Sequence, residues 1–224
     1  MKYHLKLYQE ISNSAYQEIL NDNLYEQYKK IALNRLKRLQ TKKELYDYLI
    51  DRGAKKAIAD QLIFDFTEKK YLDDAQYTKY YIELKKNQKG PLLMETELLK
   101  KGVSKHIIYQ FLNKVDTYEI LCELVEKKIR LLSHKKSKKQ IILKLKTDFM
   151  RIGFKREMVE SVISKYIDEV PEVDIAVIEK AYQVIRRSIK HEELSYEDHQ
   201  KIFAKLYQKG YPSILIKEVI QKNK

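Results

Sequence analysis

The chain has 224 residues, and its 45 lysines and arginines outnumber 32 aspartates and glutamates, which gives a formal net charge of +13 at pH 7. A surplus of this size favours a polyanionic partner, which could be nucleic acid, an anionic membrane surface or an acidic protein. The single cysteine, Cys122, excludes an intrachain disulfide bond.

The N-terminus and the apolar runs bear on localisation. Residues 1–10 mix polar and apolar side chains and lack the apolar core of a secretory signal. No run approaches the roughly 20 apolar residues that a membrane-spanning helix needs, and a lone cysteine is typical of a reducing compartment. We therefore expect a cytoplasmic protein that does not enter a membrane.

Four glycines recur at regular intervals and divide the chain. Gly53, Gly102, Gly153 and Gly210 are 49, 51 and 57 residues apart. Around each of them, the positions eight and four before and one, five, six, nine and ten after are apolar, in total 28 positions in a chain that is 44% hydrophobic. Glycine adopts the left-handed backbone that ends many helices. The sequence thus contains an internal repeat of about 50 residues in which each glycine closes one helix before the next begins.

The first repeat is expected over residues 22–72, after an N-terminal segment at residues 1–21. Thr41 and Glu44 have the spacing of a capping box, in which each side chain binds the other residue's backbone amide at a helix start. Apolar periodicity and these start signals predict three helices, at 22–37, 41–53 and 55–69.

The second repeat, residues 73–115, opens with Asp73 and Asp74. Carboxylates at a helix start bind free amides and suit the helix dipole, and the absence of a third ligand at helical spacing argues against a metal site. The predicted helices run over 74–87, from Gly90-Pro91 to Gly102, and from Ser104 to about Asn113.

The third and fourth repeats are expected over residues 116–170 and 171–224. Their predicted helices run over 117–132, 138–152 and 155–167, and then over 173–190, from Ser195 to Gly210, and over 212–222. The predicted fold class is therefore all-α, with about four tandem three-helix repeats stacked into an elongated, curved array whose neighbouring units share a core. A DNA-reading helix-turn-helix is the alternative, but the third helices contain few of the Asn, Gln and Arg side chains that read bases.

Positive charge is concentrated in one stretch. Residues 127–146 hold nine lysines and arginines and no acidic residue. Apolar residues recur within the stretch at helical spacing, which indicates two amphipathic helices that meet at a basic corner at residues 135–139. Lysines suit phosphate groups as mobile point charges. A weaker basic zone covers residues 28–56, and for both zones the alternative is a solvated surface without a partner.

The candidate nucleic-acid or partner-binding residues come from these two zones. In the stretch 127–146 they are Lys127, Lys128, Arg130, Lys135, Lys136, Lys138, Lys139, Lys144 and Lys146. In the zone 28–56 they are Arg38, Lys42, Lys43, Arg52, Lys55 and Lys56.

Motifs for catalysis and cofactor binding are missing from the sequence. It contains no phosphate-binding loop, no dinucleotide-binding glycine pattern and no HExxH. Cys122 lies in a helical apolar pattern and is expected to be a buried thiol, and His191 and His199 are expected on the surface. The 18 tyrosines could stack on single-stranded bases, although tyrosines at helical spacing more often line the edge of a core. We expect no enzyme activity, no metal and no cofactor.

Three segments, in this order, carry a resemblance to a known family. They are Tyr71-Leu-Asp-Asp-Ala-Gln-Tyr77, the segment from Lys89 to Val103 with its Gly-Pro start and Lys-Gly turn, and Phe149-Met-Arg-Ile-Gly-Phe154. Together they resemble the RecX family, regulatory proteins that act on the RecA recombinase. The resemblance covers residues 22–167 and extends less sharply to the end of the chain.

The chain departs from the family pattern at two places. Where members often have Arg-Pro-Arg-Ser, residues 38–41 keep the arginine, Arg38, and the capping hydroxyl, Thr41, but lack the proline and the second arginine. Longer members have a fourth repeat, as expected here, and usually an N-terminal extension, of which residues 1–21 are expected to be a remnant.

The resemblance implies a non-enzymatic regulator, mainly an inhibitor, of the RecA recombinase. Such a protein binds as a monomer along the groove of the RecA–DNA filament, contacts single- or double-stranded DNA through basic faces, and modulates ATPase activity, strand exchange and filament growth. Two alternatives stay open at this point: a stand-alone basic nucleic-acid-binding module without a recombinase partner, and a helical scaffold for an acidic protein.

Overall fold

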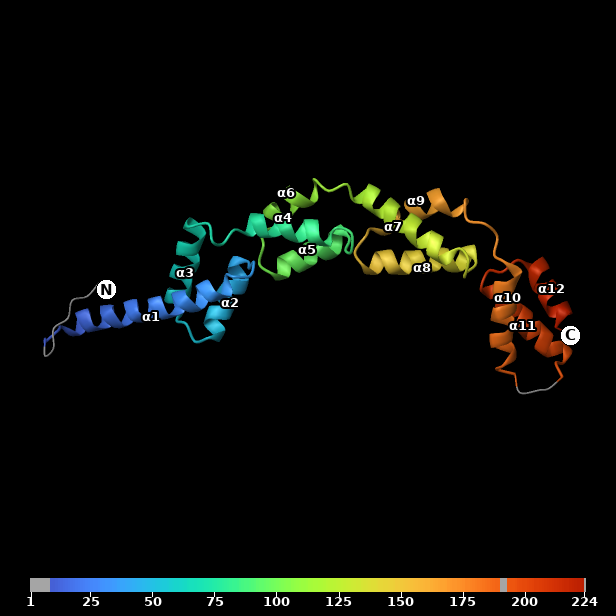
Figure 1. Cartoon of the computed structure of the whole chain (residues 1–224), viewed down its shortest axis with the longest axis horizontal. Coiled ribbons are helices and arrows are strands. Elements are labelled where there is room, and N and C mark those ends of the chain that lie inside the picture. Colours follow the sequence, from blue (N-terminus) through green and yellow to red (C-terminus); the bar gives the residue numbers. More distant parts are fainter. Residues whose placement is uncertain (1–8, 190–192, 224) are drawn as a thin grey trace. The chain divides into compact units, whose positions relative to one another are not determined.

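The computed structural model describes residues 9–189 and 193–223, and this part of the chain is helical with no strand (Figure 1). The all-α prediction is confirmed. The chain forms two compact units, residues 1–85 with 94–115 and residues 86–93 with 116–224. Each unit is described by itself.

Twelve helices occur in the described residues, in four successive groups of three. The first two groups are α1 (Asn13–Arg35), α2 (Lys42–Asp51), α3 (Lys56–Glu68), α4 (Asp74–Lys85), α5 (Pro91–Lys100) and α6 (Lys105–Leu112). The last two groups are α7 (Thr117–Leu132), α8 (Lys138–Arg151), α9 (Arg156–Ile167), α10 (Ile175–Arg186), α11 (Tyr196–Gln208) and α12 (Ser213–Lys222). With one exception, the helix ends lie within a few residues of the predicted ranges.

The exception is α1, which begins well before the expected start at residue 22. Ser12 is its N-cap, because the Ser12 hydroxyl accepts a hydrogen bond from the Ala15 amide at 3.2 Å. No glycine or proline lies between residues 13 and 35, so the helix continues for 23 residues across the expected end of the N-terminal segment. The predicted helix start at residue 22 is wrong.

The four repeat glycines follow α2, α5, α8 and α11 and all adopt the left-handed conformation, with φ between 81° and 97°. After α2, the Gly53 amide donates to the Ile50 carbonyl at 2.8 Å, and the Ala54 amide donates to the Leu49 carbonyl at 3.0 Å. The same two bonds follow the other three helices, and together they form the Schellman motif that closes a helix C-terminus. The prediction that these glycines close helices is confirmed.

Each group of three helices has its own hydrophobic core. Buried residues form four clusters, one each in α1–α3, α4–α6, α7–α9 and α10–α12. The apolar positions around the four glycines are all buried or half-buried, so the repeat pattern of the sequence is the pattern of these cores. The sequence predicted a core shared between neighbouring groups, whereas the buried residues form a separate cluster in each group.

In unit 1, the start of α2 lies against the glycine turn that follows α5. The buried Thr41 hydroxyl accepts a hydrogen bond from the Glu44 amide at 3.1 Å and donates to the Lys101 carbonyl at 2.7 Å. A Cβ at Gly102 would lie 2.4 Å from the Lys43 Cβ, so the close approach requires glycine. The predicted capping box is confirmed, and its threonine also joins two helix groups.

Unit 2 repeats this joint twice. Ser137, the N-cap of α8, donates its hydroxyl to the Lys209 carbonyl at 2.5 Å, and a Cβ at Gly210 would lie 2.5 Å from a side-chain carbon of α8. At the start of α5 there is no hydroxyl, and the Gly90 amide donates directly to the Ile152 carbonyl at 2.6 Å. In all three joints, the acceptor is the carbonyl of the residue before the repeat glycine.

The turn at Gly53 is closed by α1 of its own group. The Tyr28 hydroxyl donates to the Arg52 carbonyl at 3.2 Å, and this carbonyl is equivalent to the acceptor at the three joints. The atom nearest to a Cβ at Gly53 would be the Tyr28 hydroxyl oxygen, at 3.5 Å. Gly53 is therefore required for its backbone conformation and not for a close approach.

Candidate nucleic-acid interface

The basic stretch 127–146 forms the end of α7, a turn and most of α8. The α7 helix ends at Leu132, and α8 begins at Lys138 after a complete capping box between Ser137 and Gln140. Ser137 is buried and fastens this helix start to the turn after α11. We call residues 133–139, which comprise the turn and the first two residues of α8, the basic turn.

Asp148, two residues beyond the stretch, neutralises lysines from both helices. Its carboxylate lies 2.5 Å from the Lys128 Nζ of α7 and 2.9 Å from the Lys144 Nζ of α8. Burial raises the pKa of Asp148, but hydrogen bonds from Lys128 and Lys144 outweigh burial, so the pKa of this carboxyl lies below its ordinary value. Asp148 is therefore ionised at neutral pH and ties α7 to α8.

Two further basic side chains of the stretch have carboxylate partners. Arg130 pairs with Glu126, one turn earlier in α7, and the Lys146 Nζ lies 2.9 Å from the Glu160 carboxylate of α9. Four of the nine predicted residues are thus engaged within the chain, namely Lys128, Arg130, Lys144 and Lys146.

The other five lysines of the stretch have no ion pair with any residue that the structure describes. They are Lys127, Lys135, Lys136, Lys138 and Lys139, and the last four belong to the basic turn. Lys138 and Lys139 lie in the first turn of α8, where a cation opposes the helix dipole at a cost of about 0.3–1 kcal/mol. Residues that violate a local stability rule are often retained for function.

A hollow of about 290 Å³ adjoins the basic turn in unit 2, and three lysines line it. His134 and Lys135 line it from the basic turn, Lys180 from α10 and Lys209 from the turn after α11, and no carboxylate is among its lining residues. None of the three lysines has an ion pair with a described residue. Of these four residues, the sequence prediction named only Lys135. His134 is its neighbour in the chain, whereas Lys180 and Lys209 reach the hollow only because the last helix group packs against the basic turn.

The second predicted zone, in unit 1, is more dispersed. Lys42 and Lys43 lie in the first turn of α2, and Lys55 and Lys56 lie at the start of α3. The Lys43 Nζ lies 2.9 Å from the Asp47 carboxylate. These lysines occupy two separate helix starts and do not form a single cluster.

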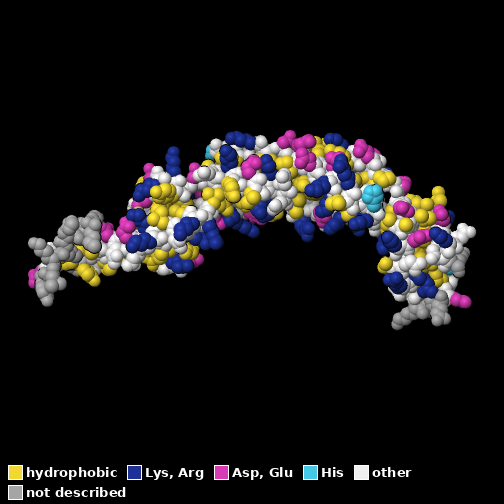
Figure 2. Space-filling model, viewed as in Figure 1, with side chains coloured by type: hydrophobic (Ala, Val, Ile, Leu, Met, Phe, Trp, Pro, Cys, Tyr) yellow, Lys and Arg dark blue, Asp and Glu magenta, His cyan; other side chains and the backbone are white. Residues whose placement is uncertain are grey.

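The two predicted arginines of this zone lie near the ends of α2. Arg38 is exposed in the loop between α1 and α2, and Arg52 is the C-cap of α2, with its guanidinium carbon 4.9 Å from the centre of the Tyr48 ring. In Figure 2, lysine and arginine side chains are spread over both units and interspersed with acidic ones on the face that is drawn. Some of the predicted basic side chains are thus paired with carboxylates, and the others have no ion pair with a described residue.

Several tyrosines brace helices and are not available to nucleic-acid bases. Tyr77 and Tyr81 are buried in the α4–α6 core with ring centres 6.4 Å apart, and the Tyr81 hydroxyl donates to the Glu97 carboxylate. The Tyr25 hydroxyl of α1 donates to the Asp65 carboxylate of α3. For these three tyrosines, the expected role at the edge of a core is confirmed.

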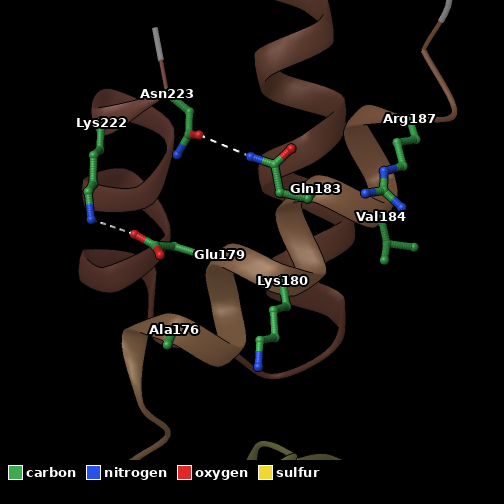
Figure 3. Close-up of a pocket in the computed structure, with 8 residues that line it drawn as sticks. All are labelled: Ala176, Glu179, Lys180, Gln183, Val184, Arg187, Lys222 and Asn223. Atoms are coloured by element: carbon green, nitrogen blue, oxygen red, sulfur yellow. Dashed lines mark hydrogen bonds and ion pairs between the residues drawn. The ribbon is translucent and has the colours of Figure 1, made fainter.

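A second hollow of unit 2, about 620 Å³, lies along α10 and α12 (Figure 3). The Lys222 Nζ lies 2.7 Å from the Glu179 carboxylate, and the Gln183 side-chain amide donates to the Asn223 side chain at 3.1 Å. These two contacts fasten α12 to α10. The lining residues of the hollow include no histidine, cysteine, serine or threonine.

Other chemistry is sparse in the described part of the chain. Cys122 is buried, as expected. Among residues 9–189 and 193–223, no group of three or more His, Cys, Asp or Glu side chains could hold a metal ion; His191, one of the two histidines considered above, lies outside the described residues. None of the helices in these residues combines the length and apolarity needed to cross a membrane.

Comparison with known proteins places the chain in a family. The regulatory protein RecX of Clostridium tetani (strain Massachusetts / E88) is 30% identical to the chain over 171 residues, which are 74% of this chain and 79% of that protein. The chain belongs to the RecX family. The regulatory protein RecX of Geobacillus sp. (strain WCH70) is 29% identical, over all of this chain and 84% of that protein. No protein-family profile matches the chain.

Two solved RecX structures share the fold. The crystal structure of RecX from Lactobacillus salivarius matches 66% of this chain and 99% of its own, with a TM-score of 0.59 and 24% identity. A second crystal structure, of a regulatory protein RecX, matches 71% of this chain and 81% of its own, with a TM-score of 0.61 and 17% identity. The relatives are named as regulators, and a regulatory role is what RecX family membership supports for this chain.

Proposed function

We propose that this RecX family protein is a non-enzymatic regulator, mainly an inhibitor, of the RecA recombinase, and that it binds as a monomer along the groove of the RecA–DNA filament. The observation that carries the DNA contact is the basic turn, whose four lysines have no carboxylate partner among the described residues. Phosphate groups of the filament DNA would supply the missing counter-charge. The groove as the binding place rests on the family resemblance.

The helix groups suggest how such binding would act on the filament. Each group folds around its own core, so successive groups can present separate surfaces to neighbouring recombinase protomers. A ligand that holds two protomers in one arrangement favours that arrangement by its differential affinity for it. ATP turnover, strand exchange and filament growth require protomers to move or add, and such a bridge would oppose these steps.

The test is a titration of the protein into the cognate recombinase on single-stranded DNA. We expect DNA-dependent ATPase activity to fall at substoichiometric amounts of the protein. A variant with Lys135, Lys136, Lys138 and Lys139 replaced by glutamate should inhibit less. If turnover is unchanged at several-fold excess of the intact protein, the proposed function is wrong.

A second candidate is a stand-alone nucleic-acid-binding module without a recombinase partner. The same unpaired basic turn favours it, because phosphate binding needs no protein partner. A pull-down with the tagged protein, with and without nuclease, separates the two candidates. A recombinase that stays bound after nuclease treatment supports the regulator, whereas recovery of nucleic acid alone supports the module.

A further inference from the structure

A hollow of about 350 Å³ in unit 1 lies between the end of α1 and the middle of α2. Its lining side chains are three cations, one amide and one phenol: Arg35, Lys37, Arg38, Asn34 and Tyr48. No carboxylate is among these lining residues, and none of the three cations has an ion pair with a residue that the structure describes. The hollow is therefore a concentration of positive charge without an internal counter-charge.

Arg35 is the lining residue with the most restricted side chain. Its guanidinium carbon lies 4.8 Å from the centre of the Tyr48 ring, an arrangement that holds the planar group in one orientation. Its Nε is buried and has no hydrogen-bond partner. A buried donor without an acceptor is unfavourable, and such groups are rare in folded proteins. The unmet donor indicates that an acceptor binds here.

Arg52, the C-cap of α2, does not line the hollow but contacts the same tyrosine ring. Its guanidinium carbon lies 4.9 Å from the centre of the Tyr48 ring, so a single ring carries two arginines. The ring attracts each cation, and the C-terminus of α1, where Arg35 lies in the last turn, also favours positive charge. The ring contacts and the helix C-terminus thus offset part of the repulsion between the cations, so they can lie close together without a ligand.

We propose that this hollow, the arginine site, binds a backbone phosphate of single-stranded DNA. Arginine presents donors in a planar fork that matches the oxygens of a phosphate group, and Asn34 adds a neutral donor beside it. The Tyr48 ring is occupied by two guanidinium groups and is not free to stack on a base, so the site recognises phosphate and not sequence. This proposal rests on the proposed function in one respect, which is that the partner is nucleic acid.

The arginine site and the basic turn differ in the charges they use. Arg35 is held by Tyr48, so less conformational freedom is lost on binding than for a mobile lysine. Of the lining residues, the sequence prediction named Arg38. Arg35 and Lys37 lie in the predicted basic zone 28–56 but were not named as binding residues, and neither were Asn34 and Tyr48. The features that reveal this site are the Tyr48 ring, which contacts two arginines, and the buried Arg35 Nε, which has no acceptor.

The experiment measures binding of the full chain to a fluorescent single-stranded oligonucleotide by anisotropy at several salt concentrations. In Arg35→Gln and in Arg38→Gln we expect the dissociation constant to rise about tenfold and the salt slope to fall by roughly 0.7 for each phosphate group that is no longer bound. Arg35→Lys, which keeps the charge without the fork, should recover less than half of the loss in log affinity. The control Arg187→Gln makes the same charge change at an exposed position of unit 2 and should change affinity less than twofold.

The outcomes separate a binding role from a structural one. Thermal unfolding of each variant is measured in parallel, and Arg38→Gln keeps the experiment interpretable if Arg35→Gln fails to fold, because Arg38 is exposed in a loop. Unchanged DNA affinity in both variants would overturn the proposal. It would also be overturned if the substitutions abolished binding of a polyglutamate peptide but left DNA binding unchanged. The basic-turn variant could lose inhibition of the recombinase ATPase while the arginine-site variants keep both inhibition and DNA affinity. That result would contradict the arginine site but not the proposed function.

Discussion

The basic turn and the helices behind it carry the same residue types but face different surroundings. In α7 and α8, Lys128 and Lys144 converge on the buried carboxylate of Asp148. In the basic turn, residues 133–139, four lysines have no ion pair with a described residue. The sequence shows one uninterrupted run of positive charge, and folding divides it into a paired part and an unpaired part.

This division has consequences for stability and for binding. A lysine that is paired with a buried carboxylate contributes to folding, and its loss leaves an uncompensated charge. An unpaired lysine at the surface contributes little to folding and keeps its full charge for a phosphate group. Substitutions in the two parts should therefore change different measured quantities.

The largest expected effect is on DNA affinity, from reversing the charge of the basic turn. Replacing Lys135, Lys136, Lys138 and Lys139 by glutamate should weaken binding to a single-stranded oligonucleotide by roughly 100-fold and lower the salt slope by roughly 0.7 for each phosphate group released. Anisotropy titrations at several salt concentrations measure both quantities. Thermal stability should stay the same or rise slightly, because these lysines have no ion pairs with described residues and glutamates in the first turn of α8 suit the helix dipole.

A matched control makes the same change in net charge elsewhere. It replaces four exposed lysines that have no ion pair with a described residue, namely Lys30, Lys105, Lys205 and Lys217. If this control loses as much affinity and salt dependence as the basic-turn variant, binding follows net charge and the basic turn is not a site.

The next largest effect is on stability, from the paired part. Asp148→Asn leaves Lys128 and Lys144 without their shared carboxylate and should lower the free energy of unfolding by about 2 kcal/mol, since the carboxylate is buried but both lysines are partly exposed. DNA affinity should be unchanged or slightly higher, because two lysines are released. Urea unfolding followed by circular dichroism measures the first quantity and anisotropy the second.

The control for this prediction is the exposed pair of Arg130 with Glu126. Glu126→Gln should cost less than about 1 kcal/mol, because exposed ion pairs contribute little. A folded Asp148→Asn protein that loses DNA affinity would contradict the division into paired and unpaired lysines.

A smaller effect is expected from the joint beneath the basic turn. In Gly210→Ala, the new Cβ would lie 2.5 Å from the Lys139 Cβ, and the left-handed backbone adds its own strain. Gly53→Ala has the same backbone strain, of roughly 1 kcal/mol, but its Cβ meets nothing closer than 3.5 Å. The difference between the two unfolding free energies, measured in urea, isolates the cost of the close approach. Equal values would mean that the joint tolerates a side chain.

The smallest expected effect is a dependence on pH. The pKa of Asp148 is lowered on folding, so its ion pairs stabilise the protein fully above the unfolded pKa of about 3.9 and lose this contribution as the pH falls through the folded pKa. The stability difference between the native protein and Asp148→Asn should therefore shrink below about pH 4. Urea unfolding at about pH 6 and about pH 3, on either side of this range, measures the difference, and a constant value would argue against the ion pairs as its cause.

The helix ends were predictable because their causes are local. A hydroxyl with Glu44 or Gln140 three residues later closes a capping box within one turn, and a glycine in the left-handed conformation closes the preceding helix through bonds to residues a few positions earlier. The boundary expected at residue 22 was wrong because no glycine or proline interrupts residues 13–35, and α1 continues from its N-cap Ser12 across that position. The four separate cores were missed because the apolar pattern shows which side chains are buried but not which of them pack together.

The sequence by itself determined that the chain is helical, where its repeat glycines close helices, and which stretch carries the most positive charge, since each of these follows from neighbouring residues. Only the tertiary structure decided which of those charges are unpaired. Lys128 of α7 is neutralised by a carboxylate of α8, while Lys180 and Lys209 come to line a hollow with Lys135, and Arg35 meets Tyr48. Ion pairs and cation–π contacts depend on distances of a few ångströms between side chains of different helices, and the packing of the helices sets those distances.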